Sequence, residues 1–139
     1  MPKALAPDIS TWPAEDPQLI GSRCGSCEFV TFPAQDRCPN CSTAGMTEEL
    51  LPRTGTIVAW TVQNFPPGAP YAGPVGEDFE PFGVGLVELD GVVRVEGRLT
   101  ENDPAKLDFG QRVELTMVPF AVDDHGEDLY TFAFRSIAQ

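Results

Sequence analysis

Beyond residue 50 the chain is a series of short apolar runs, rich in β-branched and aromatic residues and separated by turn-forming residues. Such runs predict β-strands rather than helices. In the third run, Val93, Val95 and Leu99 fall on one face, and charged residues occupy the other. The predicted strands are residues 55–65, 82–89, 92–99, 111–120 and 128–137.

The turns and the order of these strands indicate an OB-fold barrel. Asp90-Gly91, between the second and third runs, is a strong hairpin turn. Residues 102–107 predict a short helix, with Asp103 as its N-cap and Pro104 at its first position. Five strands with a small helix between the third and fourth have the connectivity of an OB-fold. An open sheet and an SH3-like barrel are the alternatives.

Two C-x-x-C pairs precede the strands and predict a rubredoxin-like zinc ribbon. Cys24 and Cys27 are separated from Cys38 and Cys41 by ten residues. Each tight turn directs two thiolates at one point, and a hairpin between the turns brings the pairs together. Four sulfur ligands close the coordination sphere, so we expect one structural zinc per chain with no position for a reactive water.

The residues around the cysteines suit such turns. We expect Gly25 to permit unusual backbone angles in the first turn and Pro39 to fix φ in the second. Four thiolates on Zn²⁺ leave a net charge of −2, and Arg23 and Arg37 are candidates to offset it.

Three other uses of these cysteines are alternatives to a zinc site. Two disulfides would require an oxidising compartment, which nothing in the sequence suggests. A rubredoxin-type iron site would use the same four ligands. A thioredoxin-like redox pair is disfavoured because no βαβ pattern surrounds either C-x-x-C.

The composition is consistent with a small globular chain. Of the 139 residues, 42% are apolar, and the abundant Gly (13) and Pro (14) suit short strands and turns. We expect three segments: a proline-rich N-terminal segment (1–20), the zinc ribbon (21–48) and the OB-fold domain (49–139). Four prolines make a long helix improbable in the first segment.

The charge argues against several kinds of partner. Nine Lys and Arg stand against 21 Asp and Glu, a net charge of −12. Such a surface repels phosphate backbones, so we expect no nucleic-acid or anionic-membrane binding. Neither a signal-like apolar run nor a stretch of about 20 apolar residues is present, and we expect a cytoplasmic protein.

The sequence offers no evident catalytic apparatus. His125, the only histidine, lies in an Asp-Asp-His-Gly turn and is expected to be a solvated turn residue. No Ser-His-Asp or Cys-His arrangement surrounds it, and no Gly-rich phosphate loop precedes a helix. We therefore predict no catalytic residue and no enzymatic activity of the chain by itself.

The order and spacing of several motifs resemble a known family, the zinc-ribbon/OB-fold accessory proteins of thiolase-like acyl-CoA enzymes. The motifs that carry the resemblance are residues 21–27, Phe32-Pro33, residues 38–41, residues 55–58, residues 81–91, residues 110–113 and residues 132–135. The paired helices that often precede the ribbon in this family are not expected here. The proline that usually follows the last Phe-x-Phe is replaced by Arg135-Ser136.

The resemblance implies a non-catalytic subunit that a partner acyl-CoA lyase or acyltransferase requires for activity. The implied partner has a thiolase fold and acts on acyl-CoA thioesters as an aldolase, thiolase or acetyltransferase. We favour carbon–carbon bond cleavage in lipid metabolism, in the degradation of a steroid or similar side chain. The alternatives are a stand-alone acyl-CoA-binding protein, a partner of a hot-dog-fold hydratase and a nucleic-acid-binding zinc-ribbon/OB protein.

Candidate contact residues lie in the loop at residues 64–83 and on the third strand. Nine of the loop's 20 residues are Pro or Gly, and long loops in compact domains are often functional. The candidates for partner or acyl-CoA contact are Phe65, Tyr71, Phe79, Phe82, Arg94 and Arg98. The simpler interpretation is that the aromatics pack over an open barrel end and that the arginines pair with surface carboxylates.

Overall fold

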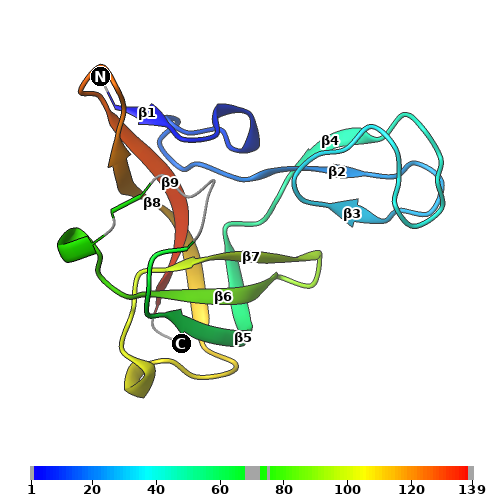
Figure 1. Cartoon of the computed structure of the whole chain (residues 1–139). Coiled ribbons are helices and arrows are strands. Elements are labelled where there is room, and N and C mark those ends of the chain that lie inside the picture. The colour runs from blue at the N-terminus through cyan, green and yellow to red at the C-terminus, as the bar shows by residue number, and fades with distance from the viewer. Residues whose placement is uncertain (1, 68–72, 75, 138–139) are drawn as a thin grey trace.

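The computed structural model describes residues 2–67, 73–74 and 76–137 (Figure 1). Within these residues the chain forms strands with a few short 3-10 turns, in agreement with the predicted mainly β fold. The ribbon comprises β2 (Ile20–Arg23), β3 (Val30–Thr31) and β4 (Thr47–Leu50). The barrel comprises β5 (Thr54–Gln63), β6 (Phe82–Leu89), β7 (Val93–Leu99), β8 (Arg112–Val122) and β9 (Asp128–Ser136). The remaining elements are β1 (Lys3–Ala4), η1 (Pro7–Ile9), η2 (Gly76–Asp78) and η3 (Pro104–Lys106).

The barrel closes in the order expected of an OB-fold. β5 pairs antiparallel with both β6 and β8, and β6 pairs antiparallel with β7. β7 then meets β9 in a short parallel pairing through Arg98↔Ala133 and Leu99↔Phe134. The long antiparallel pairing of β8 with β9 completes the ring. The closed five-stranded barrel is therefore confirmed, and an open sheet is wrong.

Alternation along the strands fills the barrel interior. In β6 every second residue from Gly83 to Leu89 is buried, while the residues between them are only partly buried. The predicted faces of β7 are also confirmed, because Val95 and Leu99 are buried whereas Arg94 and Glu96 are exposed. The expected helix at residues 102–107 is the single turn η3, capped by the Asp103 carboxylate, which accepts from the amide of Ala105 at 3.0 Å.

Ribbon and barrel share one hydrophobic core. Figure 1 shows the three-stranded ribbon sheet projecting from one side of the barrel. Leu19 and Leu51, at the two chain crossings between the modules, are fully buried and belong to the same cluster as the barrel residues. Phe32 of the ribbon meets Phe132 of β9 edge-on, with ring centroids 5.7 Å apart. The end of the ribbon nearest the barrel is therefore held by hydrophobic packing.

The proline-rich N-terminal segment lies along the barrel as a strap. β1 pairs parallel with β9, and Trp12 stacks on Tyr130 at a centroid distance of 5.3 Å. Lys3 lies 3.5 Å from both Asp123 and Glu127. Between residue 2 and the ribbon the described chain holds only β1 and the three-residue turn η1, so the expectation that no long helix precedes the ribbon is confirmed. Among the described residues, no helix has the length and apolarity needed to cross a membrane.

Candidate metal centre and ligand-contact surface

The first C-x-x-C pair forms a knuckle, meaning a tight turn with sulfurs on its inner side. The amide of Cys24 donates to the carbonyl of Phe29 at 2.9 Å, and the amide of Glu28 donates back to the Cys24 carbonyl at 3.0 Å. Arg23 closes the turn by donating to the Glu28 carbonyl at 3.2 Å. These bonds fix the backbone that presents Cys24 and Cys27.

The second knuckle repeats this geometry fourteen residues later. The amide of Cys38 donates to the carbonyl of Thr43 at 2.9 Å, and the amide of Ser42 donates to the Cys38 carbonyl at 2.8 Å. Arg37 donates to the Ser42 carbonyl at 2.6 Å. The two halves of the site are thus held by the same set of backbone contacts.

The unusual backbone angle of each knuckle falls after the cysteines rather than between them. Glu28 and Ser42 have φ of 64° and 67°, the left-handed region. Gly25 is not among the positive-φ glycines, so the expectation that Gly25 supplies the unusual angle is wrong. The reason is a backbone hydrogen bond. The amide of the fourth residue after the first cysteine of each knuckle, Glu28 or Ser42, donates to the carbonyl of that cysteine at 2.8–3.0 Å and closes the turn there.

The four sulfurs fit a single tetrahedral metal ion. Cys24 Sγ lies 3.6 Å from Cys41 Sγ, Cys27 Sγ lies 3.6 Å from Cys38 Sγ, and all four lie within 4.8 Å of one another. Tetrahedral zinc with Zn–S bonds of about 2.3 Å requires sulfurs about 3.8 Å apart. A disulfide requires about 2.05 Å, and all four cysteines are free. A bound metal would cross-link the two knuckles, and its four sulfur ligands would leave no open position.

The inner sulfurs, those of the buried Cys24 and Cys38, accept hydrogen bonds from backbone amides. Cys24 and Cys38 are each 1% exposed. The amides of Ser26 and Cys27 donate to Cys24 Sγ at 3.4 and 3.5 Å. The amides two and three residues after Cys38 donate to its sulfur at the same distances. Burial nevertheless raises the pKa of the Cys38 thiol.

The outer sulfurs, those of Cys27 and Cys41, are exposed, and each lies against a polar side chain. Asn40 Nδ2 lies 3.5 Å from Cys27 Sγ, and Thr43 Oγ1 lies 3.2 Å from Cys41 Sγ. The Asn40 amide is the leading cause of the lowered pKa of Cys27. The Thr43 hydroxyl is the leading cause of the pKa of Cys41, which falls to about 6. Both sulfurs are therefore favoured as thiolates, the form that binds metal. The sequence patterns did not point to either side chain, although a polar residue within a C-x-x-C, or two residues after it, could have signalled them.

Arg23 and Arg37 were expected to offset the charge of the site. Their hydrogen bonds go instead to oxygen atoms. Each arginine donates to a knuckle carbonyl, and Arg23 also donates to the Glu49 carboxylate at 2.6 and 2.8 Å. The Arg23 guanidinium in turn lowers the pKa of the Glu49 carboxyl. Their visible role is to brace the turns.

Three of the predicted ligand-contact residues come together on the barrel. Phe79 and Phe82 meet edge-on with centroids 6.1 Å apart, and the Arg98 guanidinium carbon lies 4.4 Å from the centre of the Phe82 ring. Beside them is a hollow of about 300 Å³, whose lining includes Phe82, Arg98, Thr100 and Asn102.

Phe65 and Arg94 are not part of this group. Phe65 is 70% exposed, and Tyr71 lies outside the described residues. Arg94 lies near the opposite end of β7, 3.5 Å from Glu88. His125 is an exposed residue of the β8–β9 turn, and its amide donates to the Asp123 carboxylate at 2.9 Å.

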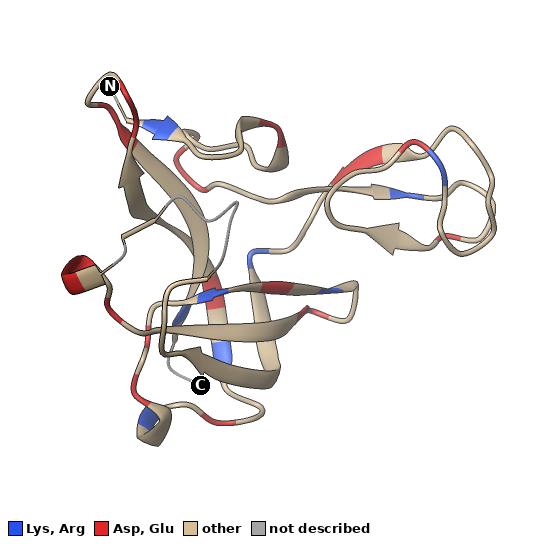
Figure 2. Cartoon of the chain, viewed as in Figure 1, with Lys and Arg blue, Asp and Glu red and all other residues tan. Residues whose placement is uncertain are grey.

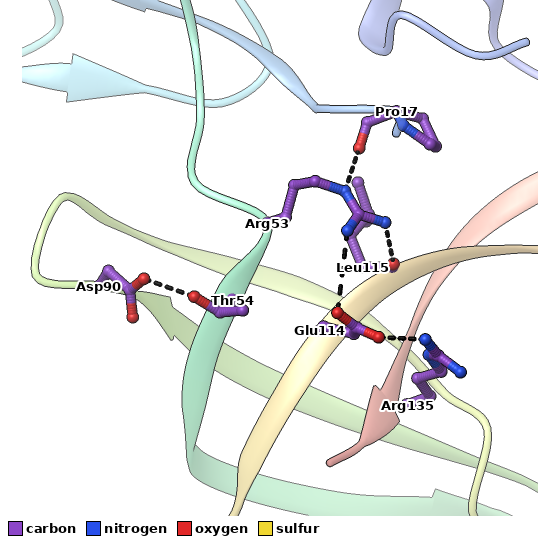
Figure 3. Close-up of polar contacts among 7 residues, drawn as sticks. All are labelled: Pro17, Arg53, Thr54, Asp90, Glu114, Leu115 and Arg135. Carbon is purple, nitrogen blue, oxygen red and sulfur yellow. Dashed lines mark hydrogen bonds and ion pairs between the residues drawn. The ribbon is translucent and has the colours of Figure 1, made fainter. Parts of the chain in front are cut away.

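A polar junction, which no sequence pattern indicated, holds the N-terminal segment to the barrel at the connection that follows the ribbon (Figure 3). Arg53 Nε donates to the Pro17 carbonyl at 2.9 Å and Nη2 donates to the Leu115 carbonyl at 3.0 Å. Glu114 lies 3.8 Å from Arg53 and also accepts from Arg135. Arg53 therefore ties the N-terminal segment to β8 at the start of the barrel.

Comparison with known families matches both modules. A model of the ChsH2 rubredoxin-like zinc ribbon domain matches residues 11–47, and a model of the ChsH2 C-terminal OB-fold domain matches residues 48–118. A DUF35 domain-containing scaffold protein of Methanothermobacter thermautotrophicus is 35% identical over 121 residues, 84% of this chain and 85% of the relative. A scaffold protein of the same description from Pyrococcus furiosus is 29% identical and covers 86% of this chain and 84% of its own.

Solved structures agree with this assignment. The Ltp2-ChsH2(DUF35) aldolase matches with a TM-score of 0.62 and 27% identity, over 86% of this chain and 84% of that chain. A DUF35 protein of unknown function from Sulfolobus solfataricus, at 11% identity and a TM-score of 0.54, shares the fold over 86% of this chain and 76% of its own. The chain therefore belongs to the DUF35 family of ChsH2-like proteins, which join a rubredoxin-like zinc ribbon to an OB-fold.

Proposed function

We propose that this protein is a non-catalytic accessory subunit of a thiolase-superfamily enzyme, an aldolase or thiolase that acts on acyl-CoA thioesters. The observation that carries the proposal is the likeness to the Ltp2-ChsH2(DUF35) aldolase over most of both chains. The scaffold descriptions of the curated relatives support the same role. In this role the partner supplies the nucleophile or base and depends on this chain for activity.

The chemistry of the metal centre supports a structural role for zinc. Four sulfurs from two matched knuckles leave no ligand position for water or substrate. The ion would hold the ribbon rigid on a base that is packed against the barrel. A rigid extension of this kind suits docking, because little conformational entropy is lost when it binds.

The group formed by Phe79, Phe82 and Arg98 is the proposed acyl-CoA contact. A guanidinium already held over an aromatic ring is preorganised to bind a phosphate oxygen, and the neighbouring hollow offers apolar and polar walls. Phe65 is a further proposed partner contact because it is 70% exposed. We propose a steroid or similar lipid side chain as the acyl group.

The same hollow favours a second candidate, direct binding of an acyl-CoA by the isolated chain. Calorimetry with CoA thioesters on the isolated chain and on its complex separates the two functions. If only the complex binds, the partner carries the acyl-CoA site. Arg98→Gln is expected to weaken any binding at this hollow, and Arg94→Gln, a change at the far end of β7, is the control.

Co-purification from the native cell tests the accessory role. We expect a thiolase-fold protein to accompany the chain in a fixed ratio, identified by mass spectrometry. A hot-dog-fold hydratase in its place would redirect the proposal to that class of partner. Elution of the chain alone, at near-native protein concentration, would contradict it.

A further inference from the structure

The two knuckles are built alike in their backbone but differ in the side chains that reach sulfur. With the fourteen-residue offset, Asn40 of the second knuckle corresponds to Ser26 of the first, and Thr43 corresponds to Phe29. Asn40 and Thr43 each have a polar atom within reach of a sulfur. Ser26 contributes its backbone amide to Cys24, and Phe29 has no polar side-chain atom.

The two side-chain contacts fall on the sulfurs that need them most. Cys27 and Cys41 are exposed, whereas Cys24 and Cys38 are buried. The sulfur of each buried cysteine also accepts hydrogen bonds from two backbone amides. Water competes for an exposed thiolate, so metal loss is expected to begin at the outer pair.

Asn40 also bridges the two halves of the centre. It belongs to the second knuckle, yet its Nδ2 lies 3.5 Å from Cys27 of the first. Thr43 lies 3.2 Å from Cys41 of its own knuckle. In the thiol form Cys41 donates to the Thr43 hydroxyl oxygen. Once Cys41 has lost its proton to bind metal, the Thr43 hydroxyl is the group of that pair that can donate, so the contact is kept as a hydrogen bond with Thr43 as the donor.

We propose that Asn40 and Thr43 are positioning residues that retain the two exposed cysteines, Cys27 and Cys41, as metal ligands. The second knuckle thereby supplies the side-chain donors for both knuckles. Each donor spreads the charge of a site that carries −2 with zinc bound, and groups of this kind typically change metal affinity by about 10–100-fold. The inference concerns metal retention and is independent of the proposed partner.

The test is zinc retention by the full-length, zinc-loaded chain. Asn40→Ser installs the residue that the first knuckle already carries in the same turn, so the fold is expected to tolerate it. Thr43→Val removes the hydroxyl at constant shape. We expect each variant to lose zinc to a chromogenic chelator at about tenfold lower chelator concentration than the wild type. Far-UV circular dichroism of the loaded proteins reports folding.

Two controls make the result specific. Ser26→Ala changes the matching position of the first knuckle and is expected to retain zinc within twofold of the wild type. Thr43→Ser restores a hydroxyl and is expected to rescue retention. Wild-type retention in both Asn40→Ser and Thr43→Val would overturn the proposal, as would a Thr43→Ser variant that loses zinc as readily as Thr43→Val.

A spectroscopic readout covers the case in which a variant loads zinc poorly. Cobalt(II) bound in place of zinc gives thiolate-to-metal charge-transfer bands that report how many sulfurs are bound. We expect these bands to weaken in Asn40→Ser and Thr43→Val at a given cobalt concentration and to be unchanged in Ser26→Ala. Identical cobalt titrations in all three would contradict the inference.

Discussion

Arg53 connects three stretches of chain that are far apart in the sequence (Figure 3). Its guanidinium donates to the carbonyls of Pro17 and Leu115 and lies 3.8 Å from the Glu114 carboxylate. The Arg53 side chain is 29% exposed, so these bonds are partly sheltered from water. A single side chain therefore joins the N-terminal segment, the ribbon-to-barrel connection and β8.

Removing this side chain is expected to destabilise the fold. Arg53→Gln shortens the reach and removes the charge, and it leaves two carbonyls without their donors. Hydrogen bonds from charged groups contribute about 1.5–3 kcal/mol, so we expect a loss of about 2 kcal/mol in the free energy of unfolding. Urea denaturation of the zinc-loaded chain measures it. Arg94→Gln is the control because that arginine is 60% exposed and is expected to contribute little. Equal stability of the two variants would contradict the role of Arg53.

A second residue-scale effect depends on pH. Asp90 accepts from the Thr54 hydroxyl at 2.5 Å and from Arg112 at 3.1 Å, and these contacts lower its pKa below the ordinary 3.8. A carboxylate with a lowered pKa stabilises the fold above pH 3.8, and this stabilisation is lost as the pH falls through the folded-state pKa.

Asp90→Asn isolates that charge, because Asn also accepts the positive φ of 40° at this turn. The variant is expected to be less stable than the wild type at neutral pH, by less than about 1 kcal/mol since the side chain is 40% exposed. The difference should close as the pH falls below 3.8. Denaturation at several pH values measures it, and a difference that stays constant with pH would refute the assignment.

At the scale of elements, the barrel depends on close approach between strands. A Cβ on Gly55 of β5 would lie 2.5 Å from the Glu88 carbonyl oxygen and 2.8 Å from a Val87 methyl carbon of β6. Because the nearest atom belongs to the backbone, the strands themselves would have to separate. The β5–β6 pairing therefore tolerates no side chain at this position.

Gly55→Ala is accordingly expected to lower the free energy of unfolding by about 1–3 kcal/mol, the usual cost of overpacking. Thermal denaturation of the zinc-loaded chain measures the effect. Gly25→Ala is the matched control, because a Cβ on Gly25 meets no atom within 4 Å. A Gly55→Ala variant as stable as this control would show that the strands can part at little cost.

At the scale of the whole molecule, ribbon and barrel behave as one packed unit. Leu19, Val30 and Leu51 belong to the same core cluster as the barrel residues. Acidic residues are spread over the ribbon, η2 and the β8–β9 turn, with few basic residues among them (Figure 2). Such a surface favours partners with basic contact regions.

Metal removal is expected to destabilise the barrel as well as the ribbon. Without the metal the knuckles lose their cross-link, and we expect Val30 and Phe32 of the ribbon, which pack in the shared core, to become less ordered. Chelation should lower the melting temperature of the barrel, as followed by circular dichroism, and added zinc should restore it. A barrel that melts at the same temperature with and without metal would show that the modules are independent.

Much of the fold and part of the site were predictable from local patterns. The five barrel strands follow from apolar alternation, and the ligand set Cys24, Cys27, Cys38 and Cys41 follows from spacing, with sulfurs that the structure brings within 4.8 Å of one another. The expectation for Gly25 failed because the strain of the turn is placed by an amide bond to the cysteine, which residue type alone does not reveal.

The strands and the two knuckles could be predicted from local patterns, because each of them arises among residues a few positions apart. The contacts between distant parts of the chain became visible in the folded molecule. The fold placed Arg98 over Phe82, Asn40 beside Cys27, and Arg53 between Pro17 and Leu115. Such contacts join strands and turns that are separate in the sequence, and no periodicity marks them in advance. The four cysteine ligands could therefore be predicted from their spacing, whereas the side chains proposed to retain the metal and those that join distant parts of the chain could not.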